Sequence, residues 1–216
     1  MSDAGYEILS IDDLERLPTT GGTQILLPLR RRLGFQPFGL NVWVGVHEGD
    51  HVIEPHREAQ GPEELYVVLR GMARFTLGDD SFDAPVGALV HAPPGTFREA
   101  TAAEPETTVL AMGAEAGKAF TPSPWEDFYV AYAKLRAGNA EQGRAAMLEA
   151  LERDPDAWQG PYNAACFEAL AGETDAALEY LRLAVEGNPT EVKQYAPDDS
   201  DLESIRADPR YTELMG

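Results

Sequence analysis

The stretch EPHREAQGPEELYVVLRG, residues 54–71, decides the fold expected for the first half of the chain. It places a histidine, His56, two residues before a carboxylate, Glu58, and a second carboxylate, Glu64, beside an apolar segment that ends in a glycine. Residues two apart on a strand point to the same face of a sheet, so the side chains of His56 and Glu58 would lie together. The stretch therefore predicts chemistry-bearing side chains gathered on one face of a β-structure.

The surrounding segments predict that residues 1–120 form an all-β domain. Short apolar segments such as QILLPL, LNVWVGV and ARFTL recur, and turn signals such as EGD, GDD and PPG separate them. Many short strands at this spacing are typical of a sandwich or barrel. From SPWEDFYVAYAKL onward the sequence is alanine-rich, with segments of helical length, which predicts an all-α domain over 125–216. The prolines between the two domains place a linker at 121–124.

The second half contains an internal repeat with a period of 34 residues. Its members are Ala131, Gly138, Met147, Ala150 and Pro155, which correspond to Ala165, Gly172, Leu181, Ala184 and Pro189. This period is typical of a helix–turn–helix unit, in which a glycine suits the turn. The pattern resembles the tetratricopeptide repeat, with units at about 123–156 and 157–190 and a capping helix at 199–214. The resemblance implies either a protein partner or, equally, a packing or dimerisation module.

Two motifs in the first half resemble those of the cupin family. In the first motif, Glu58 stands where the family has its second histidine, while the interval from Glu64 to Gly71 is kept. The second motif is GALVHAPPGTFR, residues 87–98, in which the glycine and proline spacing is kept but Arg98 replaces the last histidine. The resemblance implies a double-stranded β-helix, which is a jelly-roll barrel, followed here by the helical hairpins.

The same resemblance implies a site inside the barrel. Its candidate members are His56, Glu58, Glu64, Tyr66 and Arg98. A typical cupin binds a divalent transition metal through three histidines and one glutamate. Arginine is always charged and would repel a cation, so Arg98 favours a metal-free pocket that binds a small molecule, with the guanidinium facing a carboxylate or phosphate.

Two alternatives to that pocket stay open. One is a metal-dependent oxygenase or isomerase that uses His56, Glu58 and Glu64 as ligands of a divalent transition metal. The other is a closed network of salt bridges that fills the barrel, in which case the helical half would be the working part as a protein-interaction scaffold.

The strand that carries Glu64 also predicts a subunit contact. If Glu64 and Tyr66 point into the barrel, then Leu65, Val67 and Leu69 point outward and are apolar too. A strand that is apolar on both faces needs cover on both. In this family the cover is often a second subunit, which predicts a homodimer.

The composition excludes several classes of partner. The chain is 44% hydrophobic and 25% charged, as in an ordinary globular protein. Its formal net charge of −20 repels nucleic-acid phosphates and anionic membranes, so we expect neither as a partner. No apolar run approaches the length of a membrane span, and the first residues have no signal-peptide core, which predicts a cytoplasmic location.

Overall fold

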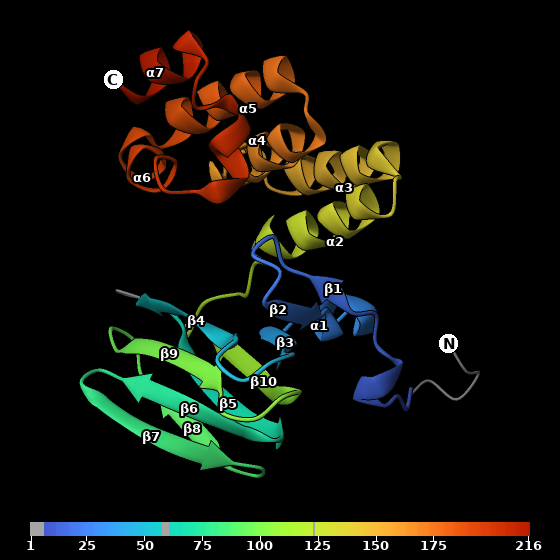
Figure 1. Ribbon diagram of the computed structural model, residues 1–216, viewed down its shortest axis with the longest axis vertical. Helices are drawn as coiled ribbons and strands as arrows, with labels where there is room; N and C mark the ends of the chain where they lie inside the picture. Colours follow the sequence, from blue (N-terminus) through green and yellow to red (C-terminus); the bar gives the residue numbers. More distant parts are fainter. Residues whose placement is uncertain (1–6, 58–60, 123) are drawn as a thin grey trace. The chain divides into compact units, whose positions relative to one another are not determined.

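The computed structural model describes residues 7–57, 61–122 and 124–216. The chain divides into two compact units, residues 1–122 and 123–216. The first is rich in sheet and the second is helical, so the predicted order of an all-β half before an all-α half is confirmed at this level (Figure 1). No helix in the described part of the chain is long and apolar enough to cross a membrane.

Short strands separated by tight turns build the β unit. Its elements in the described ranges are η1 (Ile11–Asp13), β1 (Leu17–Pro18), β2 (Gln24–Leu27), α1 (Leu29–Leu33), β3 (Gly39–Gly45), β4 (His51–Arg57), β5 (Glu63–Arg70), β6 (Met72–Leu77), β7 (Asp80–Pro85), β8 (Leu89–Ala92), β9 (Phe97–Ala102) and β10 (Thr107–Ala114). Gly71 and Gly87 have φ of +65° and +84°, a backbone conformation that glycine adopts without steric cost.

These strands form two antiparallel sheets. The larger has the order β1-β2-β3-β10-β5-β8, and the smaller has the order β4-β9-β6-β7 (Figure 1). Both sheets contribute to one apolar core: Val68 and Val109 come from the larger sheet, and Phe75 and Ala100 from the smaller. All four side chains are at most 1% exposed. The core therefore lies between the two sheets, and inward-pointing side chains of both sheets meet there.

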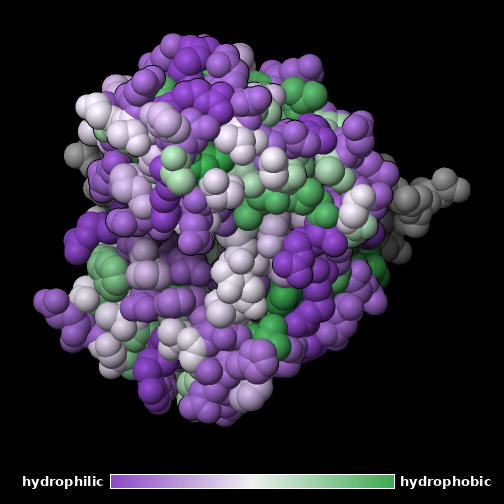
Figure 2. All heavy atoms as spheres, turned by 45° about the horizontal axis from the view of Figure 1, so that its top comes forward, coloured by the Kyte–Doolittle hydropathy of each residue, from purple (hydrophilic) through white to green (hydrophobic). Residues whose placement is uncertain are grey.

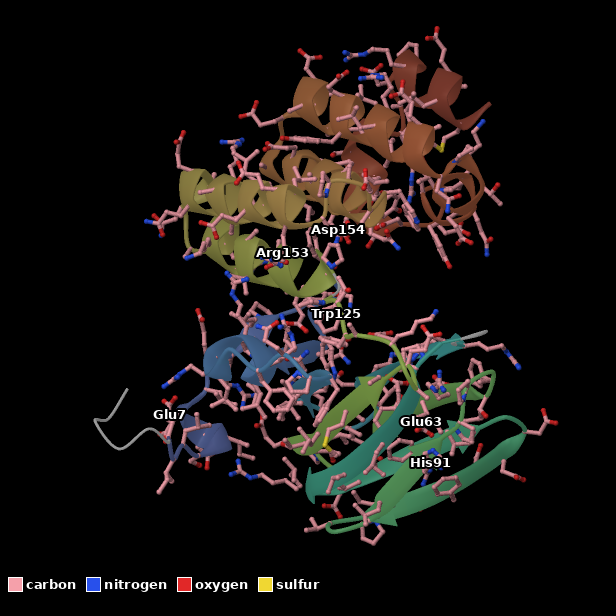
Figure 3. All side chains as sticks on the ribbon, turned by 180° about the vertical axis from the view of Figure 1, so that it is seen from behind. Glu7, Glu63, His91, Trp125, Arg153 and Asp154 are labelled. Atoms are coloured by element: carbon pink, nitrogen blue, oxygen red, sulfur yellow. The ribbon has the colours of Figure 1, made fainter. Side chains whose placement is uncertain are left out.

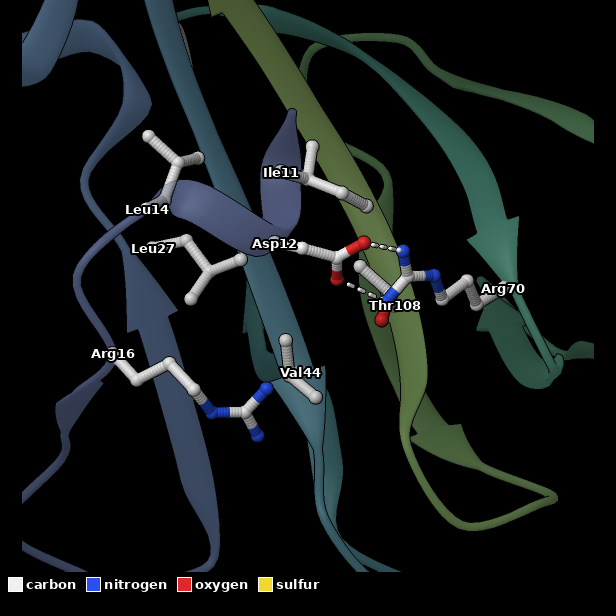
Figure 4. A pocket seen from close by; sticks show the side chains of 8 residues that line it. All are labelled: Ile11, Asp12, Leu14, Arg16, Leu27, Val44, Arg70 and Thr108. Atoms are coloured by element: carbon white, nitrogen blue, oxygen red, sulfur yellow. Dashed lines mark hydrogen bonds and ion pairs between the residues drawn. The ribbon is translucent and has the colours of Figure 1, made fainter. Parts of the chain in front are cut away.

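The N-terminal segment covers part of the outer face of the larger sheet. Leu14 packs in a second apolar cluster with Val42 and Val44 of β3, and Leu69 of β5 lies against this cluster. Arg70 binds Asp12 of η1 through two hydrogen bonds of 2.6 Å (Figure 4). The chain itself thus supplies some of the cover that β5 needs.

The remainder of this outer face is open. Leu65 of β5 is 36% exposed and Leu89 of β8 is 69% exposed. Beside them, His91 of β8 lies 3.2 Å from Glu63 of β5, measured from the imidazole Nε2 to a carboxylate oxygen (Figure 3). Polar side chains dominate the face of the molecule drawn in Figure 2, in line with the high net charge of the chain.

The helical unit consists of paired helices. In the described residues they are α2 (Pro124–Arg136), α3 (Ala140–Arg153), α4 (Gln159–Ala171), α5 (Thr174–Gly187), α6 (Pro189–Tyr195), η2 (Ser200–Ile205) and α7 (Pro209–Met215). The repeated glycines Gly138 and Gly172 have φ of +80° and +82° and end the first helix of each pair. The repeated alanines Ala131 and Ala165 are fully buried, so the paired helices approach closely.

The end of the chain is divided into three short elements. Pro189 follows α5 and opens α6, because a proline at the first helical position has no amide hydrogen to leave unbonded. Over residues 199–214, where the sequence predicts a capping helix, the structure has η2 and α7. Each begins after an aspartate cap, Asp199 and Asp208, whose side chain accepts a backbone hydrogen bond.

Candidate functional site

Three strands carry the four predicted site residues that fall within the described ranges. His56 lies on β4, Glu64 and Tyr66 lie on β5, and Arg98 lies on β9. His56 and Arg98 are directly opposite each other in the antiparallel ladder, so their side chains share a face. Glu64 and Tyr66 are two apart on a strand and point to the same face as each other. The fifth predicted residue, Glu58, lies outside the described residues.

An irregularity in β4 aims His56 inward. Ile53 pairs with Ala100 and His56 pairs with Arg98, so β4 has one residue more than β9 between these two pairs. Such a bulge places Ile53 and His56 on the same face although they are three residues apart. The signal for it in the sequence is Pro55, because proline inside a strand is confined to edges and bulges.

One carboxylate oxygen is the centre of the cluster. The hydroxyl of Tyr66 donates a hydrogen bond of 2.5 Å to Glu64 Oε2. His56 Nε2 lies 3.4 Å from the same oxygen, and Arg98 Nε lies 3.3 Å from it. No hydrogen bond from the described residues reaches the other carboxylate oxygen, Glu64 Oε1. The structure therefore brings four of the predicted residues together on one acidic group.

Arg98 is buried without its full set of partners. Its side chain is 0% exposed. Nη2 donates to the carbonyl oxygens of Pro93 and Ala92, at 3.0 and 3.4 Å. Nε and Nη1 have no hydrogen-bond partner among the described residues, since the approach of Nε to Glu64 lacks hydrogen-bond geometry. A buried donor that lacks an acceptor costs about 1–3 kcal/mol, and more when it is charged.

The environment shifts the pKa values of the two titratable partners. For Glu64, burial raises the pKa, but the hydrogen bonds with His56 and Tyr66 and the nearby positive charges outweigh it, so the pKa falls below its ordinary 4.5. For His56, burial lowers the pKa, but the hydrogen bonds with Glu64 and with the carbonyl oxygen of Glu54 outweigh it, so the pKa rises above 6.5. Both shifts favour the charged pair over the neutral one.

Two glycines face each other on β3 and β10 beside Glu64, and one of them, Gly113, makes room for the Glu64 side chain. Gly113 of β10 lies opposite Glu64, and a Cβ at this position would come within 2.9 Å of Glu64 Cγ. Gly39 of β3 lies opposite Gly113, and its Cβ would come within 3.4 Å of the Phe120 ring. Sequence reasoning missed both positions because their role depends on the strand register. A glycine inside a strand is the only signal that they leave in the sequence.

A buried amide lies on the same face. Asn41 of β3 is 4% exposed and lies opposite Ala111, which in turn lies opposite Tyr66. Residues directly opposite each other in a ladder share a face, so Asn41 points to the side on which the cluster lies. The polar residue at the start of the apolar segment NVWVGV is the signal that could have found it.

The four described residues do not fit the metal site of a typical cupin. The guanidinium of Arg98 lies 3.3 Å from Glu64 Oε2, on the carboxylate that would have to bind the ion. Two positive charges so close together in a buried site repel strongly. Of the expected ligands, His56 and Glu64 remain, and Arg98 lies where the resemblance places the last histidine. The described residues of the cluster therefore do not suit a divalent metal.

A second group of metal-binding residue types lies in the helical unit. Cys166, Asp199 and Asp201 have ligand atoms within 4.8 Å of one another. Asp199 already accepts hydrogen bonds from Tyr162 and Cys166 and caps η2. Burial raises the pKa of the Cys166 thiol well above its usual value. The hydrogen bonds that Asp199 accepts from Tyr162, Cys166 and the backbone of Asp201 give the group a structural role in the helical unit.

A surface hollow lies beside η1 in the β unit, and none of its lining residues belongs to the cluster around Glu64. Its lining residues are Ile11, Asp12, Leu14, Arg16, Leu27, Val44, Arg70 and Thr108 (Figure 4). Its two arginines are already paired, Arg70 with Asp12 and Arg16 with Glu106. The hollow thus offers a ligand no unpaired cation.

No family model matches the chain, and no curated protein matches it. Solved structures resemble its N-terminal half. A sugar phosphate isomerase from a cupin superfamily of Silicibacter pomeroyi has a TM-score of 0.44 and 18% identity, covering 51% of this chain and 76% of its own. The structure of KdgF from a Halomonas species has a TM-score of 0.41 and 16% identity, with coverages of 48% and 90%. A predicted oxalate decarboxylase from Thermotoga maritima has a TM-score of 0.41 and 14% identity, with coverages of 50% and 99%. These likenesses assign no function to this chain.

Proposed function

We propose that the β half is a cupin-like jelly-roll barrel that binds a small molecule without a metal, at a site formed by His56, Glu64, Tyr66 and Arg98. The observation that carries the proposal is the buried Arg98 guanidinium, whose Nη1 has no hydrogen-bond partner among the described residues. Buried charged groups are almost always fully hydrogen-bonded in proteins. A bound molecule that accepts from Nη1 would complete the set.

A closed structural network explains the cluster less well. In such a network, the acceptors would be distributed so that each donor has one. Here Tyr66, His56 and Arg98 all approach Glu64 Oε2, while Glu64 Oε1 and Arg98 Nη1 have no partner among the described residues. The cluster therefore has one acceptor, Glu64 Oε1, and one donor, Arg98 Nη1, that a ligand could use. This is the arrangement of a binding site, in which a few convergent polar groups orient a ligand in an otherwise apolar interior.

The cluster sits at the edge of an apolar core, as a small-molecule site requires. Tyr66 is 1% exposed and belongs to the core between the sheets, where its ring lies 5.6 Å from that of Phe75. The side chain of His56 is 35% exposed and that of Glu64 is 19% exposed. Exposure thus decreases from His56 through Glu64 to Arg98, so the guanidinium is the most deeply buried group of the cluster.

For the helical half, the proposed role is that of a packing or protein-interaction module built from tetratricopeptide-like hairpins. Support comes from the 34-residue period, from the turn glycines Gly138 and Gly172, and from a close contact at Gly143, where a Cβ would come within 2.6 Å of the Phe167 ring. A homodimer is the matching proposal for the open outer face of the larger sheet, at Leu65 and Leu89.

Retention of small molecules tests the proposed site. The full-length chain and two variants, Arg98→Met and Arg57→Met, are incubated with a small-molecule extract, washed and denatured, and the released compounds are identified by mass spectrometry. Arg57 is a matched control because it follows His56 on β4, and its Nη1 is already bonded to the carbonyl oxygen of Gly95. We expect the same compound on the unmodified chain and on Arg57→Met, and its loss from Arg98→Met. Equal retention by Arg98→Met, or no retained compound at all, would contradict the proposal.

A further inference from the structure

We infer that the ligand of this site is a small monoanionic carboxylic acid that carries a hydroxyl group, and that a phosphorylated molecule is excluded. The inference rests on the proposed small-molecule site and specifies its chemistry. It follows from the number of charges at the cluster, from the donors that lack an acceptor, and from the acceptor that lacks a donor.

The first argument is the charge that the site can accept. Arg98 supplies one positive charge, and Glu64 lies against it and offsets that charge. His56 adds at most one further positive charge. The β half as a whole has 9 basic and 18 acidic residues over positions 1–122, a balance of −9. A buried dianion would meet too little positive charge here, and a phosphate group carries a charge of about −1.5 to −2 at neutral pH. A carboxylate carries a single negative charge, which the positive charge of the cluster can balance.

The second argument is the geometry of the donors. His56 Nε2 and Arg98 Nε both lie within 3.5 Å of one atom, Glu64 Oε2, and Nη1 belongs to the same rigid guanidinium as Nε. The imidazole and the guanidinium therefore converge. His56 and Arg98 are also directly opposite each other in the β4–β9 ladder. A planar oxyanion can accept from Nη1 of the guanidinium, which has no partner among the described residues, while the imidazole lies beside it; charge-assisted hydrogen bonds of this kind are about twice as strong as neutral ones.

The third argument is the acceptor that Glu64 keeps. All three donors around Glu64 approach Oε2, and no described residue donates to Oε1. The lowered pKa keeps this carboxyl ionised near neutral pH, so it can accept but not donate. A ligand that consisted of a carboxylate alone would leave Oε1 unused. A ligand hydroxyl near its carboxylate would donate to Oε1 while the carboxylate accepts from Arg98.

A matched set of small probes tests the inference on the unmodified full-length chain. Glycolate has both the carboxylate and the hydroxyl. Acetate lacks the hydroxyl, and ethylene glycol lacks the carboxylate. Inorganic phosphate presents a phosphate oxyanion in place of the carboxylate. Binding is followed by titration of backbone amide resonances of β4, β5 and β9 in nuclear magnetic resonance spectra. We expect glycolate to bind more tightly than acetate, and at least about tenfold more tightly than phosphate or ethylene glycol, as loss of one charged hydrogen bond implies.

Variants then assign the contact to Arg98. Arg98→Met is expected to lower the affinity for glycolate by about tenfold or more, while the control Arg57→Met leaves it unchanged. If Arg98→Met does not fold, the comparison of the four probes on the unmodified chain still decides the question.

Phosphate binding as tightly as glycolate would overturn the carboxylate assignment and leave the small-molecule site standing. Ethylene glycol binding as tightly as glycolate would do the same. If no probe shifts these resonances, the assignment is overturned as well, and the retention experiment separately decides whether the site binds any small molecule.

Discussion

Replacing Glu64 by glutamine should destabilise the β half more than replacing Arg98 by methionine. Glu64→Gln removes the anion that lies 3.3 Å from Arg98 Nε and leaves a cation that is 0% exposed. Removing one partner of a buried ion pair costs about 3–5 kcal/mol, and the 19% exposure of the Glu64 side chain places the expected cost at the lower end, about 3 kcal/mol. Arg98→Met leaves a carboxylate that keeps its hydrogen bond from Tyr66, so about 2 kcal/mol is expected.

The double variant separates the pair from its surroundings. With both charges removed, no uncompensated ion remains, so the double variant should be more stable than the sum of the two single effects predicts, by about 2 kcal/mol. Unfolding in urea is followed by hydrogen exchange in peptides from β5 and β9, so that the helical unit does not contribute to the signal. Arg74→Met with Asp83→Asn removes an exposed ion pair of 2.8 Å and should show no such coupling. Additive effects of Glu64→Gln and Arg98→Met, or a Glu64→Gln variant as stable as the unmodified chain, would refute the reasoning.

Three further outcomes are expected. The folded-state pKa of His56 is raised, so the contribution of His56 to stability is complete below pH 6.5 and is lost as the pH rises through the folded-state pKa. The folded-state pKa of Glu64 is lowered, so the contribution of Glu64 is complete above pH 4.5 and is lost as the pH falls through the folded-state pKa. Urea titrations should therefore show a stability increment between these values that is smaller in the His56→Gln variant, in which Glu64 keeps its hydrogen bond from Tyr66, and an unchanged profile in that variant would contradict the pairing. Gly113→Ala should cost about 1–3 kcal/mol by displacing Glu64, measured by the same unfolding experiment, whereas Gly21→Ala, where a Cβ meets nothing within 4 Å, should be neutral. Cys166, buried with a raised pKa, should react with a thiol reagent only after the protein is unfolded, and rapid reaction of the native chain would show that the helical core is open.

The inward direction of the site residues follows from strand periodicity, but their distances do not. Alternation along ELYVVL pairs Glu64 with Tyr66 from the sequence alone. The placement of Arg98 opposite His56 depends on a bulge in β4 that one proline signals and no spacing rule locates. The convergence of three donors on one oxygen of Glu64 is a consequence of both registers together. That is why sequence reasoning could name the residues but could not choose between a closed network and an open site.

The outer face of the larger sheet shows the same limit. The sequence predicts that Leu65 and Leu69 point away from the core, and that they need cover. It does not reveal that Leu14, more than fifty residues earlier in the chain, belongs to the cluster against which Leu69 packs. Such a contact between distant segments has no local signal, because only the hydrophobic character of each segment is visible and not its partner. In the helical half the 34-residue period is itself local, so the turns at Gly138 and Gly172 could be located from the sequence.

The metal content of the full-length chain tests the central claim most directly. The protein is prepared without a tag from cells grown with added iron, manganese, nickel, zinc and copper, and the metal per chain is measured by elemental analysis. Because the Arg98 guanidinium lies on the carboxylate of Glu64, we expect less than about a tenth of an equivalent of any of these metals. About one equivalent of a single metal, lost in the His56→Gln variant, would contradict the account, because it would show that the site binds a cation despite its buried arginine.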